Sequence, residues 1–201
     1  MNLEKLQNDI RNCKICKDLP KDSKPLFHGN SNAKIVIVSQ APSKLANQLR
    51  RKWADNKSGK IFKSWLNVPE EIFYNENIFY ITSLGKCYPG KEKGGDRKPN
   101  PICASKWLTK ELRLLKPELI ITVGKQSFSW FFPDKKDKYD KFLNGKTLRW
   151  KSIEVFPLPH PSGANNAWKV RNKKRLDVII LNLREKLNKI LQNQNGKPKG
   201  F

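Results

Sequence analysis

Acidic residues are scarce in this 201-residue chain: 18 aspartates and glutamates stand against 41 lysines and arginines, giving a formal net charge of +23 at pH 7. The basic excess is spread along the whole chain rather than confined to one tail. A compact domain this basic repels itself unless a polyanion is near, so DNA or RNA is the expected partner. Compositional drift toward Lys and Asn would explain the lysines, but it would not explain the shortage of acids.

Long apolar runs are also missing. No stretch approaches the roughly 20 apolar residues that a membrane-spanning helix requires, and the charged N-terminus lacks the apolar segment of a signal peptide. We therefore expect a cytoplasmic, soluble protein without a membrane partner. Hydrophobic residues still make up 37% of the chain, including six Trp and ten Phe. This content is too high for a disordered chain and is enough to build a core.

Short, apolar, β-branched segments alternate with helical ones. Four segments have the composition of buried strands: 34–39, 77–82, 118–123 and 153–158. Helices are expected at 58–67, at 102–115, after Gly124, and in a C-terminal segment whose apolar residues recur on one face from Leu176 to Leu191. The alternation predicts an α/β fold, in which one domain over residues 1–192 has a central parallel sheet flanked by helices. Residues 193–201 are expected to form a polar, disordered tail.

In sheets of this kind the ligand site lies beyond the carboxyl ends of the strands. The unusual segments of the chain follow three of the predicted strands. They are Gln-Ala-Pro-Ser at 40–43, the stretch 83–90, and Pro-His-Pro-Ser-Gly at 159–163. The sequence therefore predicts that these three segments meet at one rim of the sheet.

The chain has only four cysteines: Cys13, Cys16, Cys87 and Cys103. The first two have the spacing of a metal knuckle, and structural disulfides are not expected in a cytosolic protein. Thiolates from two distant segments can share one metal centre and tie the N-terminal helix to the domain. The second pair is spaced more loosely than zinc sites usually are, which favours an iron–sulfur cluster and keeps zinc as the alternative. The alternative to a metal centre is that all four are ordinary buried cysteines.

Taken together, these segments resemble the iron–sulfur uracil-DNA glycosylases of the family 4 type and their bacterial relatives. The resemblance covers roughly residues 10 to 185 and rests on the order and spacing of its parts. These are Cys13-x2-Cys16, Gln40-Ala41-Pro42, Ser58-Gly59, Lys86-Cys87-Tyr88-Pro89-Gly90, Cys103 and Pro159-His160-Pro161-Ser162. The resemblance implies a uracil-DNA glycosylase-like fold with a four-iron four-sulfur cluster on the four cysteines. It also implies that a DNA base is flipped into a pocket on the predicted rim.

Cleavage of a glycosidic bond leaves negative charge on the departing base, so the site needs a hydrogen-bond donor aimed at a base carbonyl. His160 is our candidate, because it is one of two histidines and lies between two prolines that stiffen its loop. Packing of the loop is the simpler explanation of this histidine.

The residues after His160 are candidates for gripping DNA. Ser162 and the backbone at Gly163 are expected to hold a phosphate, and the loop with Pro161 is expected to enter the minor groove as a wedge. Asn165 and Asn166 either extend this grip or serve as ordinary turn residues.

Three positions depart from the resemblance. Gln40 stands where many relatives carry a water-positioning acid; glutamine is no base, but it can orient water or read a base edge. Ser83 stands where family 4 members tend to have an asparagine that reads uracil. Ala54 stands where relatives place a stacking Phe, which makes its neighbour Trp53 the candidate platform for the base. Ala41 and Pro42, which follow Gln40, are expected to line the substrate site.

If the reaction needs a carboxylate, Asp96 in the lysine-rich loop 91–98 is the candidate and Asp55 the runner-up, although either can be a simple turn residue. The leading hypothesis is a monomeric, monofunctional DNA glycosylase that removes uracil or another deaminated base. A Schiff-base mechanism would need an active-site lysine, and with so many lysines in the chain this mechanism stays open as an alternative. One alternative is a non-catalytic protein that binds lesions or single strands, and another is a zinc-stapled RNA-binding protein.

Overall fold

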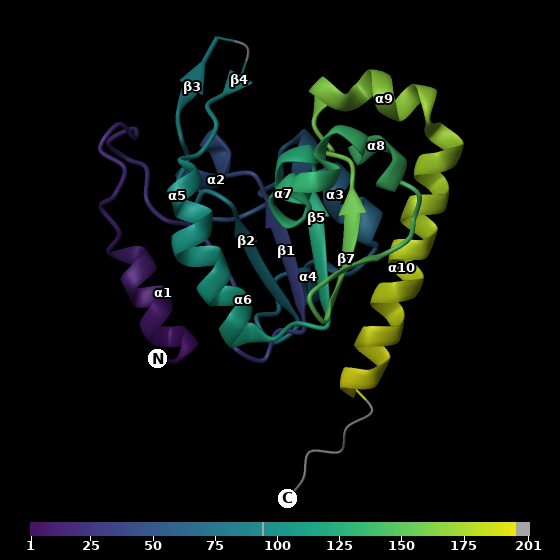
Figure 1. Ribbon diagram of the computed structural model, residues 1–201, viewed down its shortest axis with the longest axis horizontal. Helices are drawn as coiled ribbons and strands as arrows, with labels where there is room; N and C mark the ends of the chain where they lie inside the picture. Colours follow the sequence, from purple (N-terminus) through teal and green to yellow (C-terminus); the bar gives the residue numbers. More distant parts are fainter. Residues whose placement is uncertain (94, 196–201) are drawn as a thin grey trace, which may run out of the picture.

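The computed structural model describes residues 1–93 and 95–195 (Figure 1). Five strands form one sheet in the order β2-β1-β5-β7-β6. Their bounds are Ile35–Ser39 for β1, Phe79–Ser83 for β2, Leu119–Val123 for β5, Leu148–Trp150 for β6 and Ile153–Leu158 for β7. Strands β2, β1, β5 and β7 are parallel, and β6 is antiparallel to β7.

The four predicted strands are confirmed to within two residues at each end. Every residue of β1, β2 and β5 is buried, which explains why these segments are apolar along their whole length. The antiparallel edge strand β6 was not predicted, because its three residues are half-buried or exposed and lack an apolar run. The sheet is therefore mostly parallel rather than wholly parallel.

Alternate residues of β1 face two separate halves of the core. Ile35 and Ile37 pack on one side with helices α3 (Lys57–Leu66) and α10 (Lys173–Asn195). Val36 and Val38 pack on the other side with α1 (Leu3–Arg11), α6 (Thr109–Leu115) and α7 (Lys125–Phe131). The sheet is thus covered by helices on both faces, as predicted. The shorter helices are α2 (Lys44–Gln48), α4 (Glu70–Phe73), α5 (Pro101–Cys103), α8 (Tyr139–Phe142) and α9 (Asn166–Arg171).

The predicted helix 102–115 exists as one continuous helical segment, α5 to α6, with a π-helical stretch at Ala104–Leu108. Helix α10 continues to Asn195, so residues 193–195 are helical where a tail was expected, and residues 196–201 lie outside the described residues. No helix in the described part of the chain is long and apolar enough to cross a membrane.

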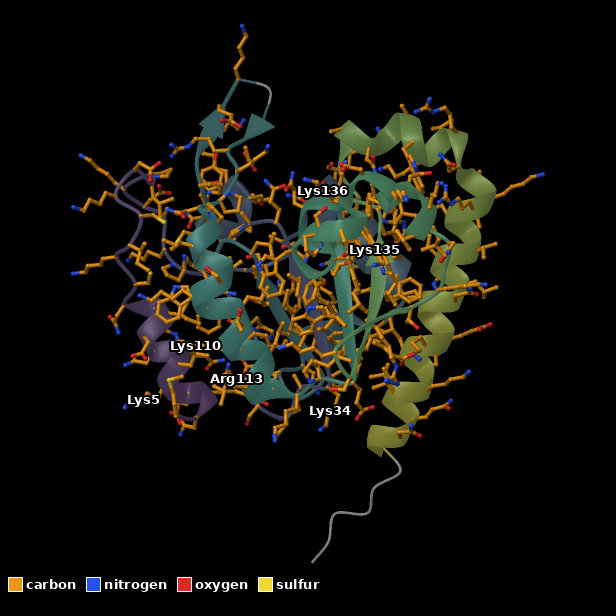
Figure 2. The ribbon with its side chains drawn as sticks, viewed as in Figure 1. Lys5, Lys34, Lys110, Arg113, Lys135 and Lys136 are labelled. Carbon is orange, nitrogen blue, oxygen red and sulfur yellow. The ribbon has the colours of Figure 1, made fainter. Side chains whose placement is uncertain are left out.

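Two segments project beyond the carboxyl ends of the strands in Figure 1. One is an antiparallel hairpin of β3 (Lys91–Glu92) and β4 (Gly95–Asp96), and the other is α9. Basic side chains lie at both ends of the sheet: Figure 2 shows Lys34 and Arg113 at the end opposite the hairpin, and Lys136 toward the hairpin end. Positive charge is therefore not confined to one face.

Candidate active site

A cavity of about 560 Å³ opens at the carboxyl ends of the strands. The segment after β1 and the loop after β7 both line it, as the sequence predicted. The segment after β2 reaches it only through the β3–β4 hairpin farther along the chain. Of the predicted site residues, the cavity brings together Gln40, Ala41, Pro42, Trp53, Asp96, His160 and Ser162. Ser83, Pro161, Gly163, Asn165 and Asn166 are not among its lining residues.

His160 is held as a neutral hydrogen-bond donor. Burial, helped by the charge of Lys169, lowers its pKa from 6.5 to about 4, so the ring is uncharged at neutral pH. Its Nδ1 accepts a hydrogen bond from the backbone N–H of Ser162 at 3.2 Å. The neutral ring therefore carries its proton on Nε2. The close approach of the ring to Gly124 explains the glycine there, since a Cβ would lie 3.3 Å from His160 Cδ2 and Gly124 has a φ of +88°.

The residues after His160 brace its loop from behind. Asn165 Nδ2 donates to the His160 carbonyl at 3.2 Å. Lys169 Nζ donates to the carbonyls of Pro161 at 2.9 Å and Ser162 at 3.2 Å. In this structure Asn165 therefore builds the turn, which was the simpler of its two predicted roles.

Trp53 forms an aromatic wall of the cavity. Its ring packs on Phe62, with centroids 4.2 Å apart, and lies 6.2 Å from the ring of His160. The indole Nε1 is buried without a hydrogen-bond partner among the described residues. Gly59 makes this arrangement possible, because a Cβ there would lie 2.1 Å from the Ala54 carbonyl oxygen. The Ser58-Gly59 motif thus allows helix α3 to start directly against the Trp53 loop.

Ser83 does not face the cavity, because Lys52 lies between them. The serine is fully buried; its hydroxyl donates to the Gly85 carbonyl at 2.7 Å and accepts a hydrogen bond from Lys52 Nζ at 2.8 Å. Lys52 lines the cavity although only 3% of the residue is exposed. Burial, together with the nearby charge of Lys86, lowers the pKa of Lys52 to about 7, against the opposing influence of Glu111. Sequence reasoning missed this residue, because nothing in the sequence distinguishes it from the other lysines.

A second buried lysine lies behind the first. Lys86 Nζ contacts Glu111 Oε2 at 2.6 Å and Thr82 Oγ1 at 2.6 Å, and both charged side chains are at most 1% exposed. Tyr80 donates to Glu111 Oε1 at 2.9 Å. Glu111 is therefore the carboxylate near both buried lysines, and of the two it hydrogen-bonds only Lys86.

The two candidate carboxylates, Asp96 and Asp55, differ in their position relative to the cavity. Asp96 lies in the β3–β4 hairpin at the cavity, where a loop was expected, and burial raises its pKa against the lowering influence of Lys91 and Tyr88. Asp55 forms an exposed ion pair with Lys63 and is not among the lining residues. The structure thus places Asp96 at the site and Asp55 outside its lining.

The four cysteines line one small cavity of about 40 Å³ between the end of α1, the segment after β2 and α5. Burial, and then the neighbouring Cys103, Cys13 and Cys16, raise the pKa of Cys87 to about 12. Cys103 Sγ accepts the backbone N–H of Lys86 at 3.3 Å. Among the described residues, however, no group of three or more His, Cys, Asp or Glu side chains stands at metal-binding spacing. The thiols are close enough to repel one another as thiolates, which is a donor set that suits a cluster or a metal ion.

The family model of the uracil DNA glycosylase superfamily matches residues 26–184 of this chain. The chain belongs to that superfamily. Membership makes it a DNA glycosylase, a hydrolase that acts on DNA, and confirms the family resemblance expected from the motifs. The fold is accordingly that of the superfamily, with a mostly parallel sheet flanked by helices.

Two relatives of this chain are named Type-4 uracil-DNA glycosylase. The protein from Saccharolobus solfataricus is 29% identical over 171 residues, which cover 81% of this chain and 77% of the relative. The protein from Thermotoga maritima is 23% identical over 162 residues, covering 80% of this chain and 81% of the relative. A solution NMR structure of a candidate uracil DNA glycosylase from Methanosarcina acetivorans aligns with a TM-score of 0.48 and 16% identity, over 81% of this chain and 95% of that one.

Proposed function

We propose that this superfamily member is a monofunctional repair glycosylase that hydrolyses the N-glycosidic bond of uracil, or of another deaminated base, flipped out of DNA into the 560 Å³ cavity. The observation that carries this proposal is His160, a neutral donor with its proton on Nε2, held at a rim cavity by Ser162 and Asn165. The sequence relatives named as Type-4 enzymes support uracil as the first base to test.

The reaction breaks the bond between the sugar C1′ and the base nitrogen, and the bonding electrons leave with the base. The neutral His160 ring donates an Nε2–H hydrogen bond to a carbonyl oxygen on which this charge develops. Trp53 offers its ring face for stacking on the base. Water then adds to C1′, and the proton that it releases neutralises the base anion, which completes the hydrolysis.

Two side chains of the cavity are suited to orient that water. Gln40 both donates and accepts hydrogen bonds, and Asp96 is a carboxylate that also lines the cavity. A leaving group that is stabilised by hydrogen bonds needs no strong base, so the absence of an acid at Gln40 is compatible with activity. Ala41 and Pro42 shape the wall beside Gln40, and Ser162, Gly163 and Asn166 face the DNA backbone in this proposal.

Cys13, Cys16, Cys87 and Cys103 are the residues that would hold a four-iron four-sulfur cluster, with zinc as the alternative. Such a group, when bound, supplies a structural tie between α1 and the segment that leads from β2 to the hairpin. The protein would act as a monomer in the cytoplasm, with DNA as its partner.

The test is an assay for abasic sites. The protein is purified anaerobically and incubated with labelled single- and double-stranded oligonucleotides that contain uracil, hypoxanthine or xanthine, and alkali then cleaves any abasic site. We expect cleavage at one or more of these bases and a loss of roughly 100-fold in rate in His160→Ala, the size expected when one transition-state donor is removed.

His28→Ala is the matched control, because His28 is the second histidine and its Nε2 is engaged with the Tyr74 carbonyl at 2.7 Å, away from the cavity lining. This variant should keep the wild-type rate within about threefold. If no substrate yields abasic sites while the protein still binds DNA tightly, the enzyme proposal is wrong, and a lesion- or strand-binding role takes its place.

A further inference from the structure

We propose that Lys52 reads the flipped base: its Nζ donates a hydrogen bond to the carbonyl oxygen on the base edge opposite the glycosidic bond, and it stabilises the base as it leaves. The inference rests on the proposed glycosylase function and names the group that selects the substrate. It replaces the sequence-based expectation that Ser83 has this role.

The position of Lys52 gives the first argument. Lys52 lines the cavity, yet only 3% of the residue is exposed, which places it at the cavity's inner end. An ammonium group has three hydrogens, and only one of them has an acceptor among the described residues, the Ser83 hydroxyl at 2.8 Å. Burying a charge with unused donors is costly unless a ligand satisfies them. The remaining hydrogens are therefore available to a base that fills the cavity.

The backbone around Lys52 is fixed in an uncommon conformation. Arg50 and Trp53, on either side of it, have φ values of +53° and +55°, in the left-handed region that non-glycine residues rarely adopt. The Tyr74 hydroxyl donates to the Lys52 carbonyl at 2.8 Å and holds the turn in place. Strained conformations of this kind persist where surrounding contacts impose them, and they concentrate at functional sites. Here the turn directs a charged side chain into the protein instead of into water.

The local charge gives the second argument. The buried carboxylate of Glu111 is hydrogen-bonded to Lys86 at 2.6 Å and has no hydrogen bond to Lys52. Among the residues that the structure describes, Lys52 therefore has no anion of its own. A base that departs with the bonding electrons carries negative charge on its carbonyl oxygens, and it would supply the missing partner. The site is thus more complementary to the departing anion than to the neutral base.

The chemistry of deamination explains what such a group would select. Deamination replaces an amino group with a carbonyl oxygen, at C4 when cytosine becomes uracil and at C6 when adenine becomes hypoxanthine. A charged ammonium only donates hydrogen bonds, so it can donate to the carbonyl oxygen but is mismatched to the amino group, which also donates. Leaving a buried donor unpaired discriminates strongly between otherwise similar ligands. One lysine at the inner end of the cavity would therefore favour uracil over cytosine and hypoxanthine over adenine.

The position of Lys52 at the inner end of the cavity implies that it contacts the edge of the base farthest from the sugar. The sugar stays attached to the DNA outside the cavity, so the carbonyl next to the glycosidic bond lies nearer the mouth. His160 is less buried than Lys52 and suits that nearer oxygen. Lys52 is left with the oxygen on C4 of a pyrimidine or C6 of a purine.

The experiment is a double comparison that changes the protein and the base together. Wild-type protein and Lys52→Met are compared in single-turnover excision of uracil and of pyrimidin-2-one, which lacks the oxygen on C4. Any difference in the intrinsic leaving ability of the two bases cancels when the ratio of rates is compared between the proteins. We expect the uracil-to-pyrimidin-2-one ratio to be at least roughly tenfold larger for the wild type, because a charged donor is lost in the variant.

Lys34→Met is the control for loss of one positive charge, since Lys34 lies at the opposite end of the sheet (Figure 2). It should retain the wild-type ratio within about twofold, and thermal melting checks that both variants are folded. Equal ratios in wild type and Lys52→Met would overturn the inference while leaving uracil excision by the wild type intact. A wild type that releases none of uracil, hypoxanthine and xanthine would instead remove the proposed function, and this inference with it.

Discussion

Two buried lysines lie at the same end of strand β2, and their surroundings differ. Lys86 contacts a buried carboxylate at 2.6 Å and a threonine hydroxyl at the same distance, so its charge is compensated inside the protein. Lys52 contacts one neutral hydroxyl and faces a cavity. A paired buried lysine is an ordinary structural feature, whereas a buried lysine with no partner of opposite charge is costly to the fold. The difference suggests that Lys86 serves the structure and Lys52 serves a ligand.

Removing the partner of Lys86 should have the largest effect on stability. Glu111→Gln leaves the buried ammonium group of Lys86 without its carboxylate, and we expect the free energy of unfolding to fall by about 3–5 kcal/mol. Urea unfolding followed by tryptophan fluorescence at pH 7 measures this change. Glu118→Gln makes the same chemical change at an exposed position and should shift the stability by less than about 0.5 kcal/mol. Equal effects of the two substitutions would mean that the buried pair is not specially stabilised.

Replacing Lys52 should raise the free energy of unfolding instead of lowering it. Its pKa is about 7 in the folded protein and about 10.4 in an unfolded chain, so below pH 7 the ammonium is charged in both states and its burial opposes folding in full. Between pH 7 and 10 the folded protein has already lost this proton, and the burial cost declines as pH rises. Lys52→Met should therefore stabilise the protein by roughly 2–4 kcal/mol at pH 6, and by less at pH 9. A variant that is less stable than the wild type at pH 6 would contradict this assignment.

A smaller change at the Lys86–Glu111 pair tests one hydrogen bond without altering the packing. Tyr80→Phe keeps the shape of a fully buried side chain and removes only the hydrogen bond to Glu111 at 2.9 Å. We expect a loss of about 1 kcal/mol in the free energy of unfolding, measured in the same urea titration. Excision of uracil should change by less than about twofold, because the cavity lining is untouched. A large loss of activity would show instead that the Lys86–Glu111 pair also takes part in the chemistry.

The sequence predicted the strands of the central sheet better than it predicted the residues at the inner end of the cavity. The strands β1, β2, β5 and β7 were found because they are apolar runs that must be buried on both faces. The edge strand β6 and the β3–β4 hairpin escaped notice, because short, exposed strands carry no such pattern.

The same contrast holds within the site. The loops with Gln40 and His160 stand out through their composition and their place after strands, and the structure brings both to one cavity. Lys52 could not be identified in this way. In a chain with 41 basic residues a lysine is expected to be solvated, and only the turn between Arg50 and Trp53 brings this one inside. Ser83 was correctly placed at the end of β2, but its side chain lies behind the lysine.

The pH dependence of uracil excision tests most directly whether the unpaired lysine takes part in the reaction. Single-turnover rates of the wild type and Lys52→Met are measured from pH 5 to 8.5. His160, with a pKa of about 4, stays neutral throughout this range and should add no change near pH 6.5. Lys52 loses its proton near pH 7, so the wild-type rate should be constant in acid and fall above that pH toward the rate of the variant, whose own profile should be flat. A wild-type profile that stays flat to pH 8.5, or one that Lys52→Met reproduces, would contradict the role assigned to this lysine.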